Sequence, residues 1–191
     1  MLHELEEKYE IRKKFTKPLL VDTNPNYLSV LALLFAFVAG YLFKEGLFVL
    51  AGIFVLGNGY LDILDGEVAK HFGRDSKFGD FIDHTFDRIA DVAMLAGIAL
   101  NPIVSLWLGG LAIIFVLLVS YMGTQYQAIQ QERLYSGVFG RSDRIALLFL
   151  SAMASYFIPD AMLYAVYIIL VLSVLTFLQR FWTSAKKIGG L

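Results

Sequence analysis

Six apolar runs follow one another along this chain, and each is close to the length that a helix needs to cross a bilayer. They cover residues 27–43, 46–64, 78–100, 102–121, 143–158 and 161–181. A membrane-spanning helix takes about 20 mainly apolar residues, and 58% of this chain is hydrophobic. Short polar or proline-containing turns separate most of the runs, so neighbouring helices reverse direction. The sequence therefore predicts an all-α, polytopic membrane protein with six transmembrane helices.

The first 24 residues differ in character from the rest of the chain. Glutamates and basic residues recur through residues 1–17 at the spacing of one helical turn, and the segment is too charged for a signal peptide. We expect residues 1–24 to form an amphipathic helix on the cytoplasmic membrane surface, followed by a linker. Residues 25–191 would form one six-helix transmembrane domain, which must carry any chemistry because no room remains for a separate soluble domain.

Basic residues predict the orientation in the membrane. If the N-terminus lies in the cytoplasm, the lysines and arginines at the ends of the runs fall on that side, and only Lys44 lies opposite. We therefore predict a multi-pass protein of the cell membrane with both termini and the active site on the cytoplasmic side. The abundant aromatic residues are typical of lipid-facing anchors, so no nucleic-acid partner is expected.

Four aspartates stand where apolar membrane helices are expected: Asp62, Asp65, Asp83 and Asp87. A carboxylate at membrane depth costs about 2.5–3.5 kcal/mol on insertion scales, so a cluster of them requires a partner. Their spacings put each pair on one helical face, and antiparallel helices would bring both pairs to one depth. Carboxylates prefer hard cations, and the chain has no cysteine to supply a thiolate. We predict a site for Mg²⁺ or Mn²⁺, with two ions because four carboxylates suit a pair.

The aspartates also carry a resemblance to a known family. The CDP-alcohol phosphotransferases share the signature D-x-x-D-G-x-x-A-R-x8-G-x-x-x-D-x-x-x-D. This chain resembles it with Asp62-x-x-Asp65-Gly66-x-x-Ala69-Lys70, eight residues, and Gly79-x-x-x-Asp83-x-x-x-Asp87. Lys70 stands where the family usually has arginine. Lysine keeps the positive charge but lacks the planar fork with which arginine binds phosphate bidentately. The surface helix and six spans also resemble the architecture of the family.

The resemblance implies an activity and a set of partners. A phosphatidyl-type or archaetidyl-type group would pass from a CDP-linked lipid to a hydroxyl of a small polar alcohol, with a phosphorylated polyol favoured, and CMP would leave. The four aspartates would hold the metals, and Asp87 would also act as the general base. A homodimer among membrane lipids is expected. The residues implied in CDP binding are Asn26, Ser29, Asp62, Asp65, Gly66, Ala69, Lys70, Ser76 and Gly79.

Basic residues before the fifth run are the candidates for binding the acceptor. The stretch from Gly140 to Arg144 offers two arginines and Ser142 as an N-cap, and such a helix start favours a phosphate group. The expected acceptor residues are Arg133, Arg141, Ser142 and Arg144; alternatively, the arginines only orient the helix in the membrane. Inositol-phosphate members of the family often end the fourth span with K-x-R, whereas residues 121–127 read Y-M-G-T-Q-Y-Q. The inositol phosphate and glycerol phosphate branches therefore both stay open.

Other interpretations of the acidic residues belong to different classes of protein. Asp83 and Asp87 alone could form a solvated first helical turn that the helix dipole favours. A divalent-cation transporter or channel would use the same aspartates, but the opposite halves of the runs lack the polar residues of a translocation path. An inactive scaffold would leave the acids unexplained. His71 and His84 adjoin the motif and are interpreted as histidines at the rim of the helices.

Overall fold

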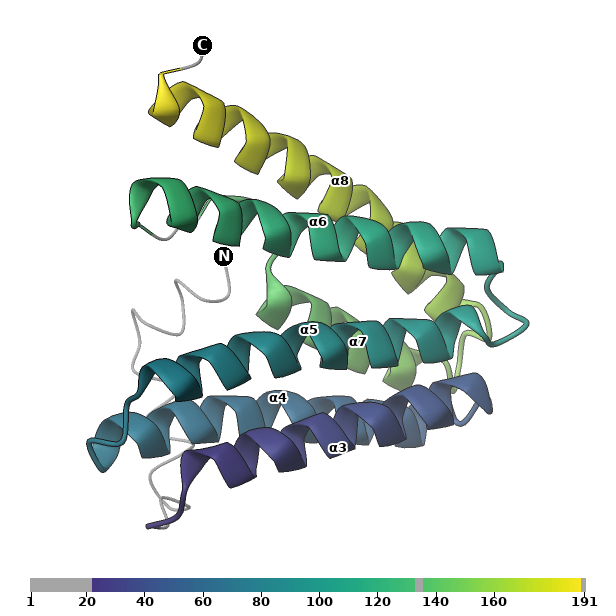
Figure 1. Ribbon diagram of the computed structural model, residues 1–191. Coiled ribbons are helices and arrows are strands. Elements are labelled where there is room, and N and C mark those ends of the chain that lie inside the picture. The colour runs from purple at the N-terminus through teal and green to yellow at the C-terminus, as the bar shows by residue number, and fades with distance from the viewer. Residues whose placement is uncertain (1–21, 133–135, 190–191) are drawn as a thin grey trace.

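The computed structural model describes residues 22–132 and 136–189, which form an all-helical bundle (Figure 1). The described helices are α3 (Pro25–Lys44), α4 (Phe48–His71), α5 (Lys77–Ala99), α6 (Leu106–Gln130), α7 (Arg141–Ala154) and α8 (Ala161–Ile188). Each corresponds to one of the six apolar runs, so the all-α prediction is confirmed. The surface helix expected within residues 1–17 lies outside the described residues, as does Arg133.

Four of these helices are long and apolar enough to cross a membrane: α3, α4, α6 and α8. Helix α5 carries four acidic residues and two basic ones along its 23 residues, and α7 has only 14 residues. The structure therefore supports an integral membrane protein with four candidate spans, fewer than the six predicted. The difference arises because α5 bears the acidic motif and α7 is too short.

Polar caps set where the helices near the motif begin. The Asn24 side chain accepts a hydrogen bond from the backbone of Asn26 at the start of α3, where Pro25 occupies the first turn. Ser76 caps α5, with its Oγ accepting from Gly79 N at 3.0 Å. Helix α4 runs to His71, two turns beyond the predicted end at residue 64, and the chain turns at Gly73 with φ of +62°. Asp62 and Asp65 therefore lie inside α4.

Small residues allow α3 and α5 to approach each other closely. A Cβ atom added to Gly97 would lie 1.9 Å from the carbonyl oxygen of Gly40, and one added to Gly40 would lie 2.3 Å from that of Ala93. Backbone contact of this kind is typical of membrane helix packing. Helix α4 packs against α3 and α7, while α6 packs against α5 and α8. This packing holds the start of α3, the last turns of α4 and the start of α5 in fixed relation to one another at the motif.

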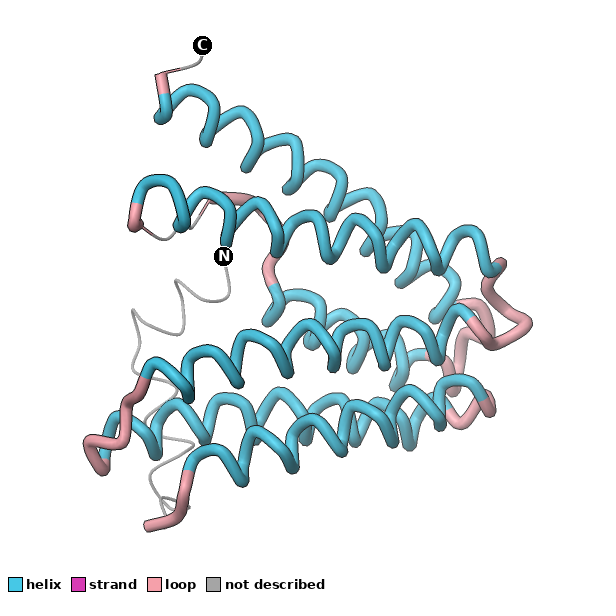
Figure 2. Tube along the Cα trace, in the orientation of Figure 1, coloured by secondary structure: helices cyan, strands magenta, loops and turns pink. Residues whose placement is uncertain are grey.

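The connections gather at the two ends of the bundle (Figure 2). The start of α3, the α4–α5 turn and the end of α8 lie at one end, and the α3–α4 turn and the α5–α6 connection lie at the other. The motif aspartates belong to the first of these ends, which we call the motif end.

Candidate active site

The four motif aspartates converge on one small cavity. Asp62 and Asp65 of α4 face Asp83 and Asp87 of α5 around a space of about 10 Å³, to which Ser29, Asn58 and Arg141 also contribute. A volume of roughly 10–15 Å³ holds about one water-sized sphere. The predicted convergence of the two carboxylate pairs is therefore present, and the space between them has the size of a single small ligand.

Asp65 is the most enclosed of the four carboxylates. Its side chain is 5% exposed, and its Oδ2 accepts a hydrogen bond of 2.6 Å from Ser29 Oγ in the second turn of α3. Asn58, one turn before Asp62 on α4, is also buried and donates to the carbonyl oxygen of Ala32 at 2.8 Å. These two bonds fasten α4 to α3 and fix the direction of the carboxylates.

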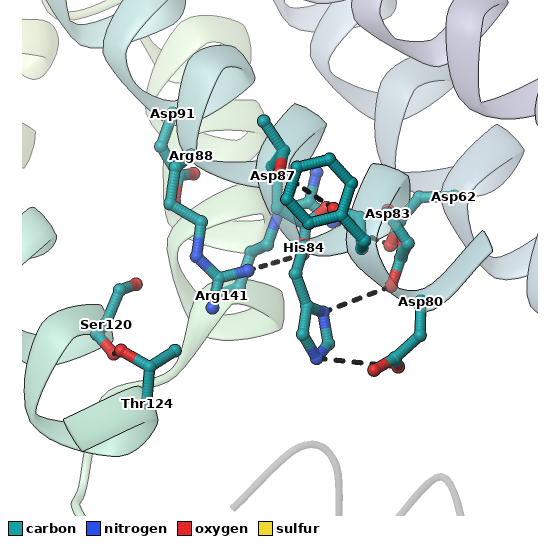
Figure 3. A network of polar contacts seen from close by, with 12 residues as sticks. Asp62, Asp80, Asp83, His84, Asp87, Arg88, Asp91, Ser120, Thr124 and Arg141 are labelled. Atoms are coloured by element: carbon teal, nitrogen blue, oxygen red, sulfur yellow. Dashed lines mark hydrogen bonds and ion pairs between the residues drawn. The ribbon is translucent and has the colours of Figure 1, made fainter. Parts of the chain in front are cut away.

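Arg141 lies between the two carboxylate helices (Figure 3). Its Nη1 is 2.6 Å from Asp62 Oδ2 and 3.0 Å from Asp87 Oδ1, and its Nη2 donates to Asn58 Oδ1 at 3.4 Å. The guanidinium thus offsets part of the negative charge of the cavity. Arg141 was expected to meet the acceptor, and in this structure it contacts carboxylates expected to bind metal.

The start of α7 differs from its prediction. The helix begins at Arg141 after Gly140, so Ser142 lies in the first turn and is not the N-cap. The Asp143 carboxylate instead accepts a hydrogen bond of 2.9 Å from Gly140 N. The prediction of Ser142 as the cap is wrong because the helix starts two residues earlier than a Ser142 cap would allow. This start directs Arg141 toward α4 and α5.

Arg144 and Asp91 form a second ion pair one turn deeper in the bundle. Arg144 Nη2 is 2.5 Å from Asp91 Oδ2, and the residues are 3% and 4% exposed. A guanidinium so enclosed and paired faces the neighbouring helix and not a cavity. The ion pair fastens α7 to α5, and acceptor binding by Arg144 stays a prediction.

Three of the residues expected to bind CDP gather at the starts of α3 and α5. A Cβ atom added to Gly79 would lie 3.2 Å from Ser76 Oγ and 3.8 Å from Asn26 Oδ1. A Cβ atom added to Gly66 would meet nothing within 4 Å, so this part of α4 borders open space. Ala69 is half-buried and Lys70 is exposed, about one turn nearer the end of α4.

A larger pocket lies between α5 and α6 and was not predicted. Its volume is about 550 Å³, and Arg88 connects it to the small cavity because Arg88 Nη1 lies 3.4 Å from Asp87 Oδ2. The spacing of its α5 residues, which recur on one helical face, was the available signal. The pocket is lined by Lys77, Asp80, Phe81, His84, Thr85, Arg88, Leu117, Ser120, Tyr121 and Thr124.

Comparison with known proteins places these features in a family. Residues 22–179 match the model of CDP-alcohol phosphatidyltransferases. The archaetidylinositol phosphate synthase of Pyrococcus horikoshii is 32% identical over 187 residues, which cover 94% of this chain and 97% of that protein. The enzyme of the same name from Methanothermobacter thermautotrophicus is 30% identical, over 81% of this chain and 80% of that protein.

Solved structures share the arrangement of the helices. The crystal structure of Mycobacterium tuberculosis phosphatidylinositol phosphate synthase with CDP-DAG bound has a TM-score of 0.78 and 25% identity, covering 92% of this chain and 94% of that chain. A structure of the same enzyme in complex with manganese and citrate has a TM-score of 0.78 and 25% identity, covering 91% and 88%. The resemblance inferred from the motif is confirmed.

Proposed function

Because this chain belongs to the CDP-alcohol phosphatidyltransferase family, we propose that it transfers the phosphatidyl-type or archaetidyl-type group of a CDP-linked lipid to a hydroxyl of an inositol phosphate and releases CMP. The convergence of the four motif aspartates beside a larger pocket carries this proposal. A cation transporter is set aside because the chain belongs to this family and two relatives that match most of it are named as synthases. Their names also favour inositol phosphate over glycerol phosphate, although K-x-R is missing from residues 121–127.

All six described helices cross the membrane in this proposal. Helices α5 and α7 lie within the bundle beside the four candidate spans, and their charges pair with one another instead of facing lipid. The motif end faces the cytoplasm because Lys70, Arg74, Lys77 and Lys186 lie there, whereas Lys44 lies at the opposite end. Residues 25–191 form the catalytic domain, and the family resemblance favours a homodimer.

The residues of the small cavity fit divalent cations. Carboxylate oxygens from two facing helices are the ligands that Mg²⁺ and Mn²⁺ take in proteins. Asp62, Asp65, Asp83 and Asp87 would hold two ions, the second in place of the Arg141 guanidinium that now lies between Asp62 and Asp87. The ions would neutralise charge on the diphosphate and on the departing CMP. Ser29 keeps Asp65 in place through its 2.6 Å hydrogen bond. The residues at the helix starts, Asn26, Ser76 and Gly79, together with Gly66, Ala69 and Lys70, bind the CDP portion.

The larger pocket suits the acceptor. Lys77 and Arg88 supply positive charge for its phosphate, and Ser120 and Thr124 supply hydroxyls for hydrogen bonds to the polyol. Asp87 lies where the cavity and the pocket meet, since Arg88 lines the pocket and contacts its carboxylate. There Asp87 takes the proton of the acceptor hydroxyl while the oxygen of that hydroxyl attacks the lipid-side phosphorus. The bond from that phosphorus to the bridging oxygen breaks, and CMP leaves with the electron pair.

Arg141 competes with cations for the carboxylates that it contacts. Replacing Arg141 with glutamine removes a positive charge 2.6 Å from Asp62 and 3.0 Å from Asp87. We expect the affinity of the purified protein for Mn²⁺ to rise by about tenfold, equivalent to about 1.4 kcal/mol. Titration calorimetry measures this change, and Arg74→Gln, which alters an exposed arginine paired with Asp22, serves as the control. Weaker Mn²⁺ binding by Arg141→Gln would show that the guanidinium organises the carboxylates.

Acceptor-dependent release of CMP tests the proposed function. The purified protein in liposomes is incubated with a CDP-activated lipid, Mg²⁺ and either inositol 1-phosphate, glycerol 3-phosphate, serine, inositol or glycerol. We expect CMP release with inositol 1-phosphate to exceed that with inositol, because Lys77 and Arg88 meet the phosphate. A chelator should abolish the release. Equal CMP release with glycerol 3-phosphate and with inositol 1-phosphate would contradict inositol phosphate as the specific acceptor. No CMP release with any of the five alcohols would contradict a CDP-linked lipid as the donor.

A further inference from the structure

His84 brings an imidazole nitrogen to the edge of the acidic cavity (Figure 3). Its Nδ1 lies 3.4 Å from Asp83 Oδ2, and the ring also lines the larger pocket. This nitrogen is buried and has no hydrogen-bond partner among the described residues. A buried polar atom that makes no hydrogen bond requires an explanation, of which a bound ion is one. The position of Nδ1 beside a carboxylate favours a cation.

The other ring nitrogen faces a second carboxylate. His84 Nε2 lies 3.6 Å from Asp80 Oδ1, one helical turn earlier on α5. Histidines that bind metals generally donate their remaining N–H to a carboxylate, which fixes the tautomer and the orientation of the ring. Asp80 therefore lies where it can orient the ring, with Nδ1 turned toward Asp83.

Three possible donor atoms lie close together. Asp83, His84 and Asp87 each offer an atom, and these atoms lie within 4.8 Å of one another. Two of the three residues belong to the family motif, whereas His84 is not one of its fixed positions. The set combines two carboxylate oxygens with one nitrogen.

We propose that His84 is a nitrogen ligand of the cation held by Asp83 and Asp87, and that it gives this site a preference for transition-metal ions over Mg²⁺. The inference rests on the proposed function, in which these aspartates bind a divalent cation. Mg²⁺ is a hard cation that takes oxygen ligands, while imidazole binds first-row transition metals. Asp80 is a positioning residue in this arrangement.

Pulsed electron paramagnetic resonance of bound Mn²⁺ tests the ligand directly. The untagged full-length protein, without nucleotide, is loaded with one equivalent of Mn²⁺ and examined for coupling to ¹⁴N. We expect coupling in the wild type and its loss in His84→Ala, with at least about a tenfold rise in the Mn²⁺ dissociation constant. The matched control is His71→Ala, because His71 is an exposed histidine at the end of α4 and should leave the coupling unchanged.

Isotope labelling and metal selectivity provide two further tests of His84 as a ligand. Wild-type protein labelled with ¹⁵N-histidine should replace the ¹⁴N pattern with that of ¹⁵N, and this result does not depend on the folding of a variant. The ratio of Mg²⁺ to Mn²⁺ dissociation constants should fall by about tenfold in His84→Ala. Mn²⁺ bound by the wild type without nitrogen coupling would overturn the role of His84 and leave the proposed function standing. Failure of the wild type to bind Mn²⁺ would overturn both.

Discussion

The Asp87→Asn variant is expected to lose acceptor-dependent CMP release by about 10²- to 10⁴-fold, the range for loss of a general base. Asparagine keeps the shape of the side chain but cannot take a proton and is a weaker ligand for a hard cation. The loss should be large because Asp87 contacts both Arg141 of the cavity and Arg88 of the pocket. It is measured as the initial rate of CMP release at saturating Mg²⁺ and inositol 1-phosphate.

A matched variant separates this effect from a general loss of negative charge. Asp75 is an exposed aspartate in the turn between α4 and α5 at the motif end, so Asp75→Asn changes the same group without entering the cavity. Its rate should stay within about twofold of the wild type, because substitutions on the surface rarely alter a packed site. Equal activity of Asp87→Asn and the wild type would rule out Asp87 as both base and ligand. If Asp87→Asn loses activity but keeps the Mn²⁺ affinity of the wild type, Asp87 acts in proton transfer and not as a metal ligand.

Local sequence was sufficient to predict the helices and the acidic cavity. The free energy of transferring an apolar run into a membrane depends mainly on that run, so hydropathy located all six described helices. The convergence of Asp62 and Asp83 followed from helical spacing and a short connection. The extension of α4 to His71 was missed because the apolar run ends earlier, whereas the helix continues to the turn at Gly73.

The contacts of the arginines depend on packing between distant segments. Arg141 reaches Asn58, 83 positions away in the chain, and no regular spacing in the sequence indicates that these two residues meet. Asn58 itself was foreseeable in part, since it lies one helical turn before Asp62 on the same face. His84 was interpreted as a rim histidine, although Asp80 stands four residues before it, at the spacing of one helical turn. In the structure its ring nitrogens face Asp80 and Asp83 of its own helix.

Breaking the buried ion pair between Arg144 and Asp91 should have the largest effect on stability. In Arg144→Met the guanidinium is lost, and the Asp91 carboxylate, which is 4% exposed, remains without its partner. Removal of one member of a buried pair costs about 3–5 kcal/mol, because an uncompensated charge stays in a medium of low polarity. We expect a decrease of this size in the free energy of unfolding, measured by titrating mixed micelles with sodium dodecyl sulfate and following helicity by circular dichroism.

The double variant Arg144→Met with Asp91→Leu provides the decisive comparison. Two apolar side chains of similar volume leave no charge to desolvate, and such replacements are often neutral or stabilising. The double variant should therefore recover most of the stability that Arg144→Met loses. Its decrease in the free energy of unfolding should be much smaller than the sum of the decreases in the two single variants. If Arg144→Met instead keeps its stability but can no longer be saturated with inositol 1-phosphate, Arg144 leaves Asp91 to bind the acceptor. The free energy of unfolding thus distinguishes an arginine that holds α5 to α7 from one that the substrate recruits.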